Sequence, residues 1–289
     1  MKKNNLTFLI LGAGGMLGSS LLRYFSGKAA FDVVASVRST AALSGMTNQG
    51  KYRVIAGIDA ENSDDLRRMF DLAKPAVVVN CVGVVKQLAV AEDALVSIPL
   101  NSLLPHRLAH LCAETGCRLI HFSTDCVFSG KKGGYLETDI PDATDLYGRS
   151  KLLGEVDYPH AITLRTSLIG HELLGVRSLV NWFLAQEGSV YGFTKAIFSG
   201  LPTVEIARVI EEYVLPHPEL HDVYHLSVDP ISKHDLLSMV KDVYGKKIEI
   251  VPDDSLVIDR SLDSTRFRQA TGFVTKPWPE LVQAMHDFG

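Results

Sequence analysis

A glycine-rich turn near the N-terminus constrains the fold more than any other feature of the sequence. Gly12-Ala13-Gly14-Gly15-Met16-Leu17-Gly18 follows an apolar run, Thr7–Leu11, and opens a segment with apolar residues at helical spacing, Met16–Ser26. A strand, a glycine turn and a helix in this order are typical of a dinucleotide-binding unit, because glycines permit a tight turn and close backbone approach to a pyrophosphate. The helix N-terminus then presents unpaired N–H groups to the phosphates. The cofactor-binding residues expected here are Gly12, Gly15, Met16, Leu17 and Gly18.

The rest of the N-terminal half alternates strand-like runs with helix-like segments. The further expected strands are Asp32–Val37, Tyr52–Ile55, Ala76–Cys81, Arg118–Phe122 and Ala161–Arg165. The further expected helices are Ser63–Ala73, opened by Ser63, and Leu103–Thr115, ended by Gly116. Apolar strands without alternation, separated by helices, indicate parallel strands buried on both faces. We therefore predict an α/β fold with a Rossmann-type doubly wound parallel sheet, whose ligands bind at the carboxyl ends of the strands.

After about Ser167 the pattern loosens, which indicates a smaller C-terminal α/β substrate lobe. The expected helices are Leu179–Gln186, Thr203–Tyr213, Ser232–Tyr244 and Pro279–Phe288, and the expected strands are Val223–Ser227 and Lys247–Val251. We assign residues 1–166 to the dinucleotide-binding domain, with 199–227 returning to it. Residues 167–198 and 228–289 then form the substrate-binding lobe.

Composition and charge exclude several classes of protein. The chain has 289 residues, of which 46% are hydrophobic and 21% charged, so wholesale disorder is excluded. Its net charge is −4 and it has no basic run longer than Lys131-Lys132, which argues against nucleic-acid or anionic-membrane partners. The apolar runs are too short for a membrane span. The 4 cysteines form no C-x-x-C pair, so we expect reduced thiols and a cytoplasmic protein.

The end of the second expected strand indicates which nicotinamide cofactor is preferred. Arg38 follows this strand, where a protein that prefers NAD often has an acidic residue for the ribose 2′-hydroxyl. A guanidinium at this place suits a 2′-phosphate, so we expect NADPH, with NADH also compatible. The alternative for Arg38 is a solvated surface arginine. Asp59-Ala60, after the third strand, is assigned to the adenine, although Asp59 could equally cap a turn.

Tyr147-Gly148-Arg149-Ser150-Lys151 places a phenol and an ammonium group four residues apart, on one face of a helix. An isolated phenol has a reference pKa near 10 and transfers protons poorly at neutral pH. A nearby lysine favours the phenolate and lowers the pKa of Tyr147 toward a useful range. The pattern alone is common, but it becomes specific together with the glycine turn and with Ser123-Thr124-Asp125 after the fifth strand.

With these motifs the sequence resembles the extended short-chain dehydrogenase/reductases and, among them, the dTDP-4-dehydrorhamnose reductase family of sugar-nucleotide reductases. The resemblance runs nearly end to end. Its further landmarks are Asn80-Cys81-Val82-Gly83, Asn101, His121–Phe128, Gly154-Glu155, Arg165-Thr166-Ser167, Ser199–Thr203 and Arg260–Asp263.

The resemblance implies reduction of a 4-keto-6-deoxy-hexose carried on dTDP or UDP, a reaction that supplies sugars for polysaccharide biosynthesis. It implies that Tyr147 protonates the carbonyl oxygen, that Lys151 holds the nicotinamide ribose and tunes Tyr147, and that Thr124 donates to the same oxygen. Asn101 would support the proton relay. The resemblance also implies that Cys81, Val82 and Gly83 contact the cofactor and that Asp125 contacts the sugar. Lys86 and Arg260 would contact the sugar or the diphosphate. The alternative for these two residues is that they are ordinary surface charges. The partner implied is this small-molecule nucleotide sugar, and a homodimer is compatible with the sequence.

The sequence departs from the family pattern at two positions. Cys126 and Leu168 stand where the family often has aromatic residues. The nucleotide and the sugar substituents of the substrate are therefore not determined by the resemblance, whereas the reduction itself is still implied. Cys126 has no evident base partner, and we assign it to packing rather than to nucleophilic catalysis.

Other functions are left as alternatives. A dehydratase of this superfamily has an acidic pair after the threonine, but Cys126 follows Thr124-Asp125, which favours simple reduction over a sugar-nucleotide dehydratase or epimerase. A non-catalytic NADP-binding regulatory subunit is the other alternative, since some relatives of the family have this role. His106 and His110 have i, i+4 spacing, but Arg107 replaces the glutamate of the zinc-protease motif, so we assign no metal.

Overall fold

The computed structural model describes residues 5–46, 50–86 and 88–289, which form two compact units. The first unit consists of Met1–Ser123, Asp145–Leu164 and Pro218–Val223, and the second of Thr124–Thr144, Arg165–His217 and Tyr224–Gly289. This division differs from the expected domains in that residues 124–144, 165–166, 199–217 and 224–227 belong to the second unit.

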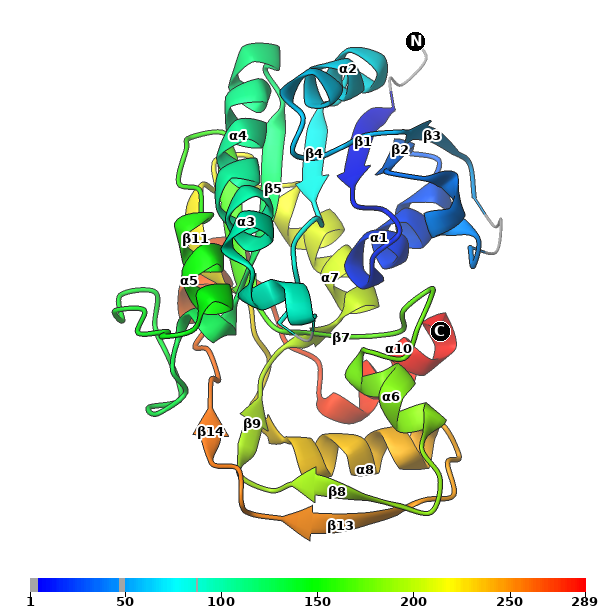
Figure 1. Cartoon of the computed structure of the whole chain (residues 1–289), viewed down its shortest axis with the longest axis vertical. Helices are drawn as coiled ribbons and strands as arrows, with labels where there is room; N and C mark the ends of the chain where they lie inside the picture. Colours follow the sequence, from blue (N-terminus) through cyan, green and yellow to red (C-terminus); the bar gives the residue numbers. More distant parts are fainter. Residues whose placement is uncertain (1–4, 47–49, 87) are drawn as a thin grey trace. The chain divides into compact units, whose positions relative to one another are not determined.

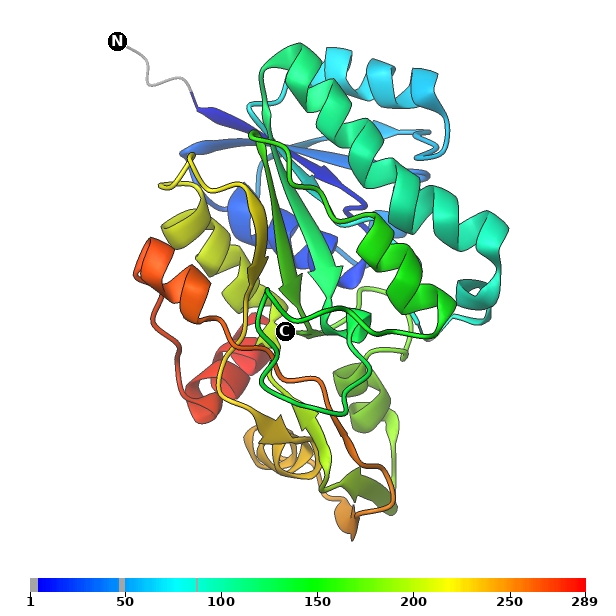
Figure 2. The ribbon, with the colours of Figure 1, turned by 90° about the vertical axis from the view of Figure 1, so that its left-hand side faces the viewer.

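The first unit is built on the large sheet (Figures 1 and 2). Its strands are β1 (Leu6–Leu11), β2 (Phe31–Val37), β3 (Tyr52–Ala56), β4 (Val77–Asn80), β5 (Arg118–Thr124), β6 (Ala161–Thr166) and β11 (Asp222–His225). They lie in the order β11-β6-β5-β4-β1-β2-β3, and β1 pairs in parallel with both β2 and β4. The pairs β2–β3 and β4–β5 are also parallel. The order 3-2-1-4-5-6 confirms the predicted Rossmann-type fold.

Helices cover both faces of this sheet because neighbouring strand residues point to opposite sides. Helix α1 (Met16–Ser26) packs on one face, where the rings of Phe8 and Phe25 are 4.4 Å apart. Helices α2 (Ser63–Ala73) and α4 (Leu104–Thr115) cover the other face, where Leu9 and Leu11 of β1 join their core. Figure 2 shows α1 on one side of the strands and α2 and α4 on the other.

The predicted ends of α2 and α4 agree with the structure in part. The side chain of Asn62, and not that of Ser63, caps α2, since its Oδ1 accepts hydrogen bonds from the N–H groups of Asp64 and Asp65. Gly116 ends α4 in the left-handed conformation, with φ of 70°, as expected. Upstream, the helix extends through α3 (Ala94–Ser97) and a π-helical segment, Ile98–Leu103, that the sequence analysis did not predict. Pro105 explains the irregularity, because it has no N–H group to donate to the carbonyl of Asn101 in a regular α-helix.

The second unit contains short strands and helices, which confirms the expected smaller C-terminal α/β lobe. Its paired strands are β7 (Leu168–Ile169) with β10 (Leu201–Pro202), β8 (Ser189–Phe193) with β13 (Glu249–Asp253), and β9 (Ala196–Phe198) with β12 (Ile231–Ser232) and β14 (Ile258–Asp259). Its helices are α6 (Leu179–Ala185), α7 (Thr203–Val209), α8 (Lys233–Val243), α9 (Thr265–Thr271) and α10 (Trp278–Phe288). Ser232 caps α8 as expected, since its Oγ accepts from the N–H of Asp235 at 3.0 Å. In the part of the chain that the structure describes, no helix is both long and apolar enough to span a membrane.

Candidate active site

The turn between β1 and α1, together with the first turn of α1, contains four glycines, of which Gly12, Gly14 and Gly18 have no room for a side chain and Gly15 is open. Gly12 has a φ of +80°, a conformation that favours glycine. A methyl group at Gly18 would overlap the backbone oxygen of Gly12, so this position serves close packing of helix and turn. A methyl group at Gly15 would lie 3.5 Å from the same oxygen and meet nothing closer. Gly15 is exposed at the N-cap of α1, where no side chain caps the helix, so the first-turn N–H groups at Met16 and Leu17 fit a phosphate ligand.

The loop after β4 lies against this glycine turn. Asn80 Oδ1 accepts a hydrogen bond from the N–H of Val82 at 3.1 Å, which bends the chain through Cys81-Val82-Gly83. This bond assigns the other amide atom, Nδ2, as the donor to His121 Nδ1 at 3.2 Å. A methyl group at Gly12 would lie 2.9 Å from Val82 Cγ2, so the two loops are in close contact. Burial raises the pKa of the Cys81 thiol, which disfavours its thiolate form.

Three other predicted cofactor residues follow β2 and β3. Arg38 is exposed directly after β2, at the same sheet edge as the glycine turn because β1 and β2 are parallel. Asp59 accepts a hydrogen bond from the N–H of Glu61 at 3.0 Å, which is the turn-capping arrangement that the sequence left as its alternative. Ala60 packs against the core. A contact of Asp59-Ala60 with adenine stays a prediction.

Helix α5 (Leu146–Leu153) carries both residues of the tyrosine–lysine motif. Asp145 caps the helix by accepting from the N–H of Gly148 at 2.9 Å. Lys151 is buried, and its Nζ donates to the carbonyl oxygen of Phe122 at 2.6 Å. Burial lowers the pKa of Lys151 to about 8, and the charge of Glu155 opposes this shift. The ammonium group is thus held in a fixed place while its proton becomes easier to lose.

Asn101 connects this helix to the loop after β4. Its Oδ1 accepts from the N–H of Val84 at 2.9 Å, and its Nδ2 donates to Ser150 Oγ at 3.1 Å. The Ser150 hydroxyl in turn donates to the carbonyl oxygen of Tyr147 at 3.0 Å. A methyl group at Gly83 would lie 3.2 Å from Asn101 Oδ1 and 4.0 Å from Lys151 Nζ. The first unit therefore brings Gly83, Asn101, Lys151 and the backbone of Tyr147 together.

Lys86, expected near the sugar or diphosphate, forms an ion pair of 2.9 Å with Asp145, the cap of α5. Both side chains are partly exposed, so this pair contributes little to stability but gives Lys86 a structural partner.

The second unit holds another group of predicted residues. Thr124 Oγ1 accepts from the N–H of Cys126 at 3.1 Å and donates to Asp125 Oδ1 at 3.2 Å. Burial raises the pKa of the Asp125 carboxyl, while the charge of Arg260 opposes the rise. Arg260 Nε also donates to the carbonyl oxygen of Phe128 at 2.8 Å. Thr124, Asp125 and Arg260 are thus neighbours, and the Thr124 hydroxyl proton is directed at Asp125.

Sequence reasoning did not assign a role to three polar residues that organise the first unit's site. Ser150 lies inside the tyrosine–lysine motif, and its position one residue before Lys151 gives no sign of its contact with Asn101. Asn80 and His121 stand opposite each other on β4 and β5. The contact between Asn80 and His121 could have been predicted from the sequence, since polar residues at the ends of adjacent buried strands need a hydrogen-bonding partner.

The chain is similar to one protein family over nearly its whole length and to two kinds of characterised protein. A family model described as the RmlD substrate binding domain matches residues 6–287. The dTDP-4-dehydrorhamnose reductase of Aggregatibacter actinomycetemcomitans is 26% identical, over 95% of this chain and 96% of that protein. Subunit beta of methionine adenosyltransferase 2 from Danio rerio is 28% identical, over 64% of this chain and 60% of that protein.

Among solved structures, dTDP-4-dehydrorhamnose reductase from Bacillus anthracis in complex with NADP superposes with a TM-score of 0.79. The two chains are 20% identical, and the match covers 97% of this chain and 98% of that one. This likeness shows a shared fold.

Proposed function

The chain belongs to the RmlD substrate binding domain family, and from this premise we propose that it reduces the 4-keto group of a 6-deoxy-hexose carried on dTDP or UDP. The observation that carries the proposal is the assembly of Lys151, Asn101 and the Tyr147 backbone beside Gly83. A protein that only binds a dinucleotide has no need for a phenol and a buried ammonium group on one helix face.

A nicotinamide cofactor, when bound, supplies the hydride, and we propose that NADPH is preferred. Gly12, Gly15 and Gly18 with the first turn of α1 would hold its pyrophosphate. Arg38 would pair with the 2′-phosphate from its exposed place after β2. The loop Cys81-Val82-Gly83, fixed against Gly12, would line the nicotinamide end.

The chain's own residues supply the proton. We assign Tyr147 as the general acid that donates its phenolic proton to the substrate carbonyl oxygen. The Lys151 charge, held by Phe122, favours the phenolate that remains on Tyr147. Asn101 and Ser150 position this helix, because they fasten the backbone of Tyr147 to the loop that contains Gly83.

The second unit's polar group is assigned from the family pattern. Thr124 would donate to the substrate carbonyl oxygen, which requires its hydroxyl to turn from Asp125 Oδ1. Asp125 would accept from a sugar hydroxyl, and Arg260 would hold the diphosphate or keep Asp125 ionised.

A regulatory subunit is the second candidate, favoured by the similarity to methionine adenosyltransferase 2 subunit beta over 64% of the chain. In this case the glycine turn would still bind NADPH, but the Tyr147 phenol would transfer no proton. A dehydratase or epimerase is less favoured because Cys126 occupies the place of the second acidic residue.

The decisive test is cofactor oxidation, followed at the nicotinamide absorbance with enzymatically made dTDP- and UDP-4-keto-6-deoxy sugars. NADPH and NADH are compared in parallel. Turnover with one of the sugars establishes the reductase, whereas tight NADPH binding without any turnover favours the regulatory subunit.

The matched variant is Tyr147→Phe, which removes only the hydroxyl. General acid catalysis typically contributes about 10²–10⁴-fold, so turnover should fall by this amount while NADPH affinity is kept. Full activity of the variant would contradict the role of Tyr147.

A further inference from the structure

A polar contact that the proposed mechanism does not use fastens the end of α5 to β5. Ser123 is buried near the end of β5, and its Oγ donates to Oε1 of Glu155 at 2.6 Å. Glu155 follows the helix closely, since α5 ends at Leu153 and Gly154 caps it. The carboxylate is half-buried, so this charge-assisted hydrogen bond forms where water has limited access.

The chain beyond α5 keeps a helical course as far as Glu155. The N–H of Gly154 bonds to the carbonyl oxygens of Lys151 and Leu152, and the N–H of Glu155 donates to the carbonyl oxygen of Leu152 at 3.2 Å. Residues four apart on such a turn lie on one side of it. Glu155 therefore lies on the same side of the helix end as Lys151.

Two consecutive residues of β5 hold these two side chains. Lys151 Nζ donates to the carbonyl oxygen of Phe122 at 2.6 Å, and the Glu155 carboxylate accepts from the hydroxyl of Ser123. The ammonium and the carboxylate are thus anchored to neighbouring groups of the same strand. Packing fixes this arrangement, because a methyl group at Gly154 would overlap the backbone oxygen of Asn101.

The electrostatics of the site agree with this placement. Burial lowers the pKa of Lys151 to about 8, and the charge of Glu155 acts in the opposite direction. The carbonyl of Phe122 is only a dipole, whereas Glu155 carries a full negative charge. Glu155 therefore favours the charged form of the ammonium group more than its neutral anchor can.

Four other titratable groups surround Lys151 on the elements packed against it. His121 of β5 stays neutral because burial, and after it the Lys151 charge, lower its pKa. Burial raises the pKa of the Cys81 thiol in the loop after β4. His106 of α4 bonds through Nε2 to the last carbonyl of α5 at 2.9 Å, and Tyr147 shares the helix with Lys151. In the proposed mechanism none of these four groups is an anion before proton transfer.

We propose that Glu155, held by Ser123, is a positioning residue that keeps the Lys151 ammonium group charged and in place beside Tyr147. This role rests on the proposed function, because a protein that only binds a dinucleotide needs no charged lysine for proton transfer. Glu155 acts through Lys151, and Ser123 acts through Glu155.

A double-mutant cycle in the full chain tests this contact without any turnover. The wild type, E155Q, K151M and the double variant are compared by urea unfolding at pH 7 and pH 9.5. E155Q keeps an oxygen that accepts from Ser123 and removes only the charge. At pH 7, E155Q should cost more stability in the wild type than in K151M, whereas at pH 9.5 the two costs should be equal because Lys151 has lost its proton. An equal cost in both backgrounds at pH 7 would overturn the proposal.

The pH profile of kcat is the second readout. E155Q should move the alkaline decrease of turnover to lower pH by on the order of one unit, because Lys151 then loses its proton more readily. S123A keeps the charge but removes its anchor, so it should move the decrease in the same direction by less. An unchanged profile in E155Q would contradict the role of Glu155. Absence of turnover with every sugar would instead contradict the reductase, and the unfolding cycle would still decide the contact.

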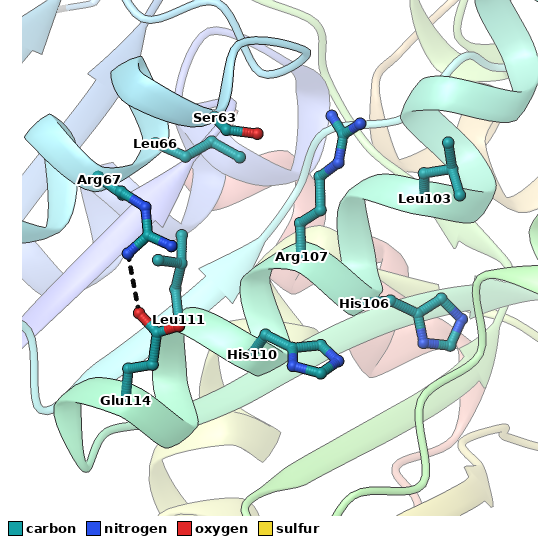
Figure 3. Close-up of a pocket in the computed structure, with 9 residues that line it drawn as sticks. All are labelled: Ser63, Leu66, Arg67, Leu103, His106, Arg107, His110, Leu111 and Glu114. Atoms are coloured by element: carbon teal, nitrogen blue, oxygen red, sulfur yellow. Dashed lines mark hydrogen bonds and ion pairs between the residues drawn. The ribbon is translucent and has the colours of Figure 1, made fainter.

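E114Q is the matched control. Glu114 of α4 pairs with Arg67 of α2 at 2.9 Å, and both side chains are exposed (Figure 3). Loss of this charge should leave the alkaline decrease in place and should not couple to K151M at either pH. A shift in E114Q as large as that in E155Q would overturn the proposal, since the net charge of the chain and not Glu155 would then be responsible.

Discussion

The ammonium group of Lys151 is anchored to the backbone carbonyl of Phe122, with a distance of 2.6 Å between Nζ and the oxygen. The contact joins α5 to β5 and buries a cation against a neutral acceptor. A carbonyl dipole stabilises a charge less than a carboxylate does, and burial therefore lowers the pKa of Lys151 from 10.5 to about 8. The residue proposed to tune Tyr147 thus titrates close to the working range of an enzyme.

We expect turnover to decrease as the pH rises through about 8, because Lys151 is charged below its pKa and neutral above it. The measurement is a pH profile of kcat with saturating NADPH and substrate. A K151R variant, whose guanidinium stays charged, should lose this alkaline decrease even if its turnover is lower. The same decrease in K151R would assign it to another group.

Loss of the Lys151 proton should lower turnover but raise the free energy of unfolding. Between about pH 8 and 10.5 the unfolded chain keeps a proton on this lysine that the folded chain has released. The contribution of Lys151 to the free energy of unfolding therefore rises with pH across this window and is lowest below pH 8. Urea unfolding of the wild type and K151M at pH 7 and pH 9.5 checks this, since the difference should shift in favour of the wild type at the higher pH.

The Ser150 hydroxyl should affect turnover through position and not through chemistry. Ser150→Ala removes the bonds to Asn101 Nδ2 and to the carbonyl of Tyr147, which costs about 1–2 kcal/mol of stability. We expect kcat to fall roughly tenfold with little change in the KM for NADPH, because the glycine turn is not touched.

Ser102→Ala is the control for this effect. Ser102 is buried on the π-helical segment that also carries Asn101. Its hydroxyl donates to the backbone carbonyl of Ser150 at 2.8 Å and not to the Asn101 side chain. Similar losses of kcat in both variants would mean that general loosening of the helices, and not the Asn101 contact, is responsible.

Arg38→Ala should separate the two nicotinamide cofactors. Charge-assisted hydrogen bonds to a phosphate contribute about 1.5–3 kcal/mol, so affinity for NADPH should fall roughly 10- to 100-fold while affinity for NADH is kept. Fluorescence titration of both cofactors measures this, with Arg53→Ala as control because Arg53 pairs with Asp32 on the neighbouring strands. Equal losses for NADPH and NADH would show that Arg38 does not contact the 2′-phosphate.

The elements that the sequence predicted well are those that local patterns determine. The apolar run before Gly12 and the helical spacing after it gave β1 and α1, and the four-residue spacing of Tyr147 and Lys151 placed both on α5. Each of these depends on neighbours within about two helical turns, where propensity and periodicity decide the structure.

Side-chain partners from distant segments could not be predicted in this way. Asn101 and Ser150 are 49 residues apart, and Asn101 lies on a π-helical segment that no local pattern predicts. Lys86 pairs with Asp145 instead of standing free, and Asn62 replaces Ser63 as the cap of α2. In each case several polar groups compete for one partner, and the tertiary packing selects among them.

The two glycines at either end of the first turn of α1 should separate stability from binding. In Gly18→Ala the new methyl group would overlap the backbone oxygen of Gly12 and lie 2.9 Å from Ala13 Cα, and neither backbone atom can move without opening the turn. We expect a loss of about 1–3 kcal/mol in the free energy of unfolding, as for other overpacked sites. In Gly15→Ala the methyl group meets nothing closer than 3.5 Å, so stability should change by less than about 1 kcal/mol. The same methyl group would project from the exposed N-cap into the space proposed for the pyrophosphate, and NADPH affinity should fall by roughly tenfold or more. Urea unfolding and NADPH titration of both variants check the pair. A stable Gly15→Ala variant with wild-type affinity for NADPH would place the pyrophosphate elsewhere.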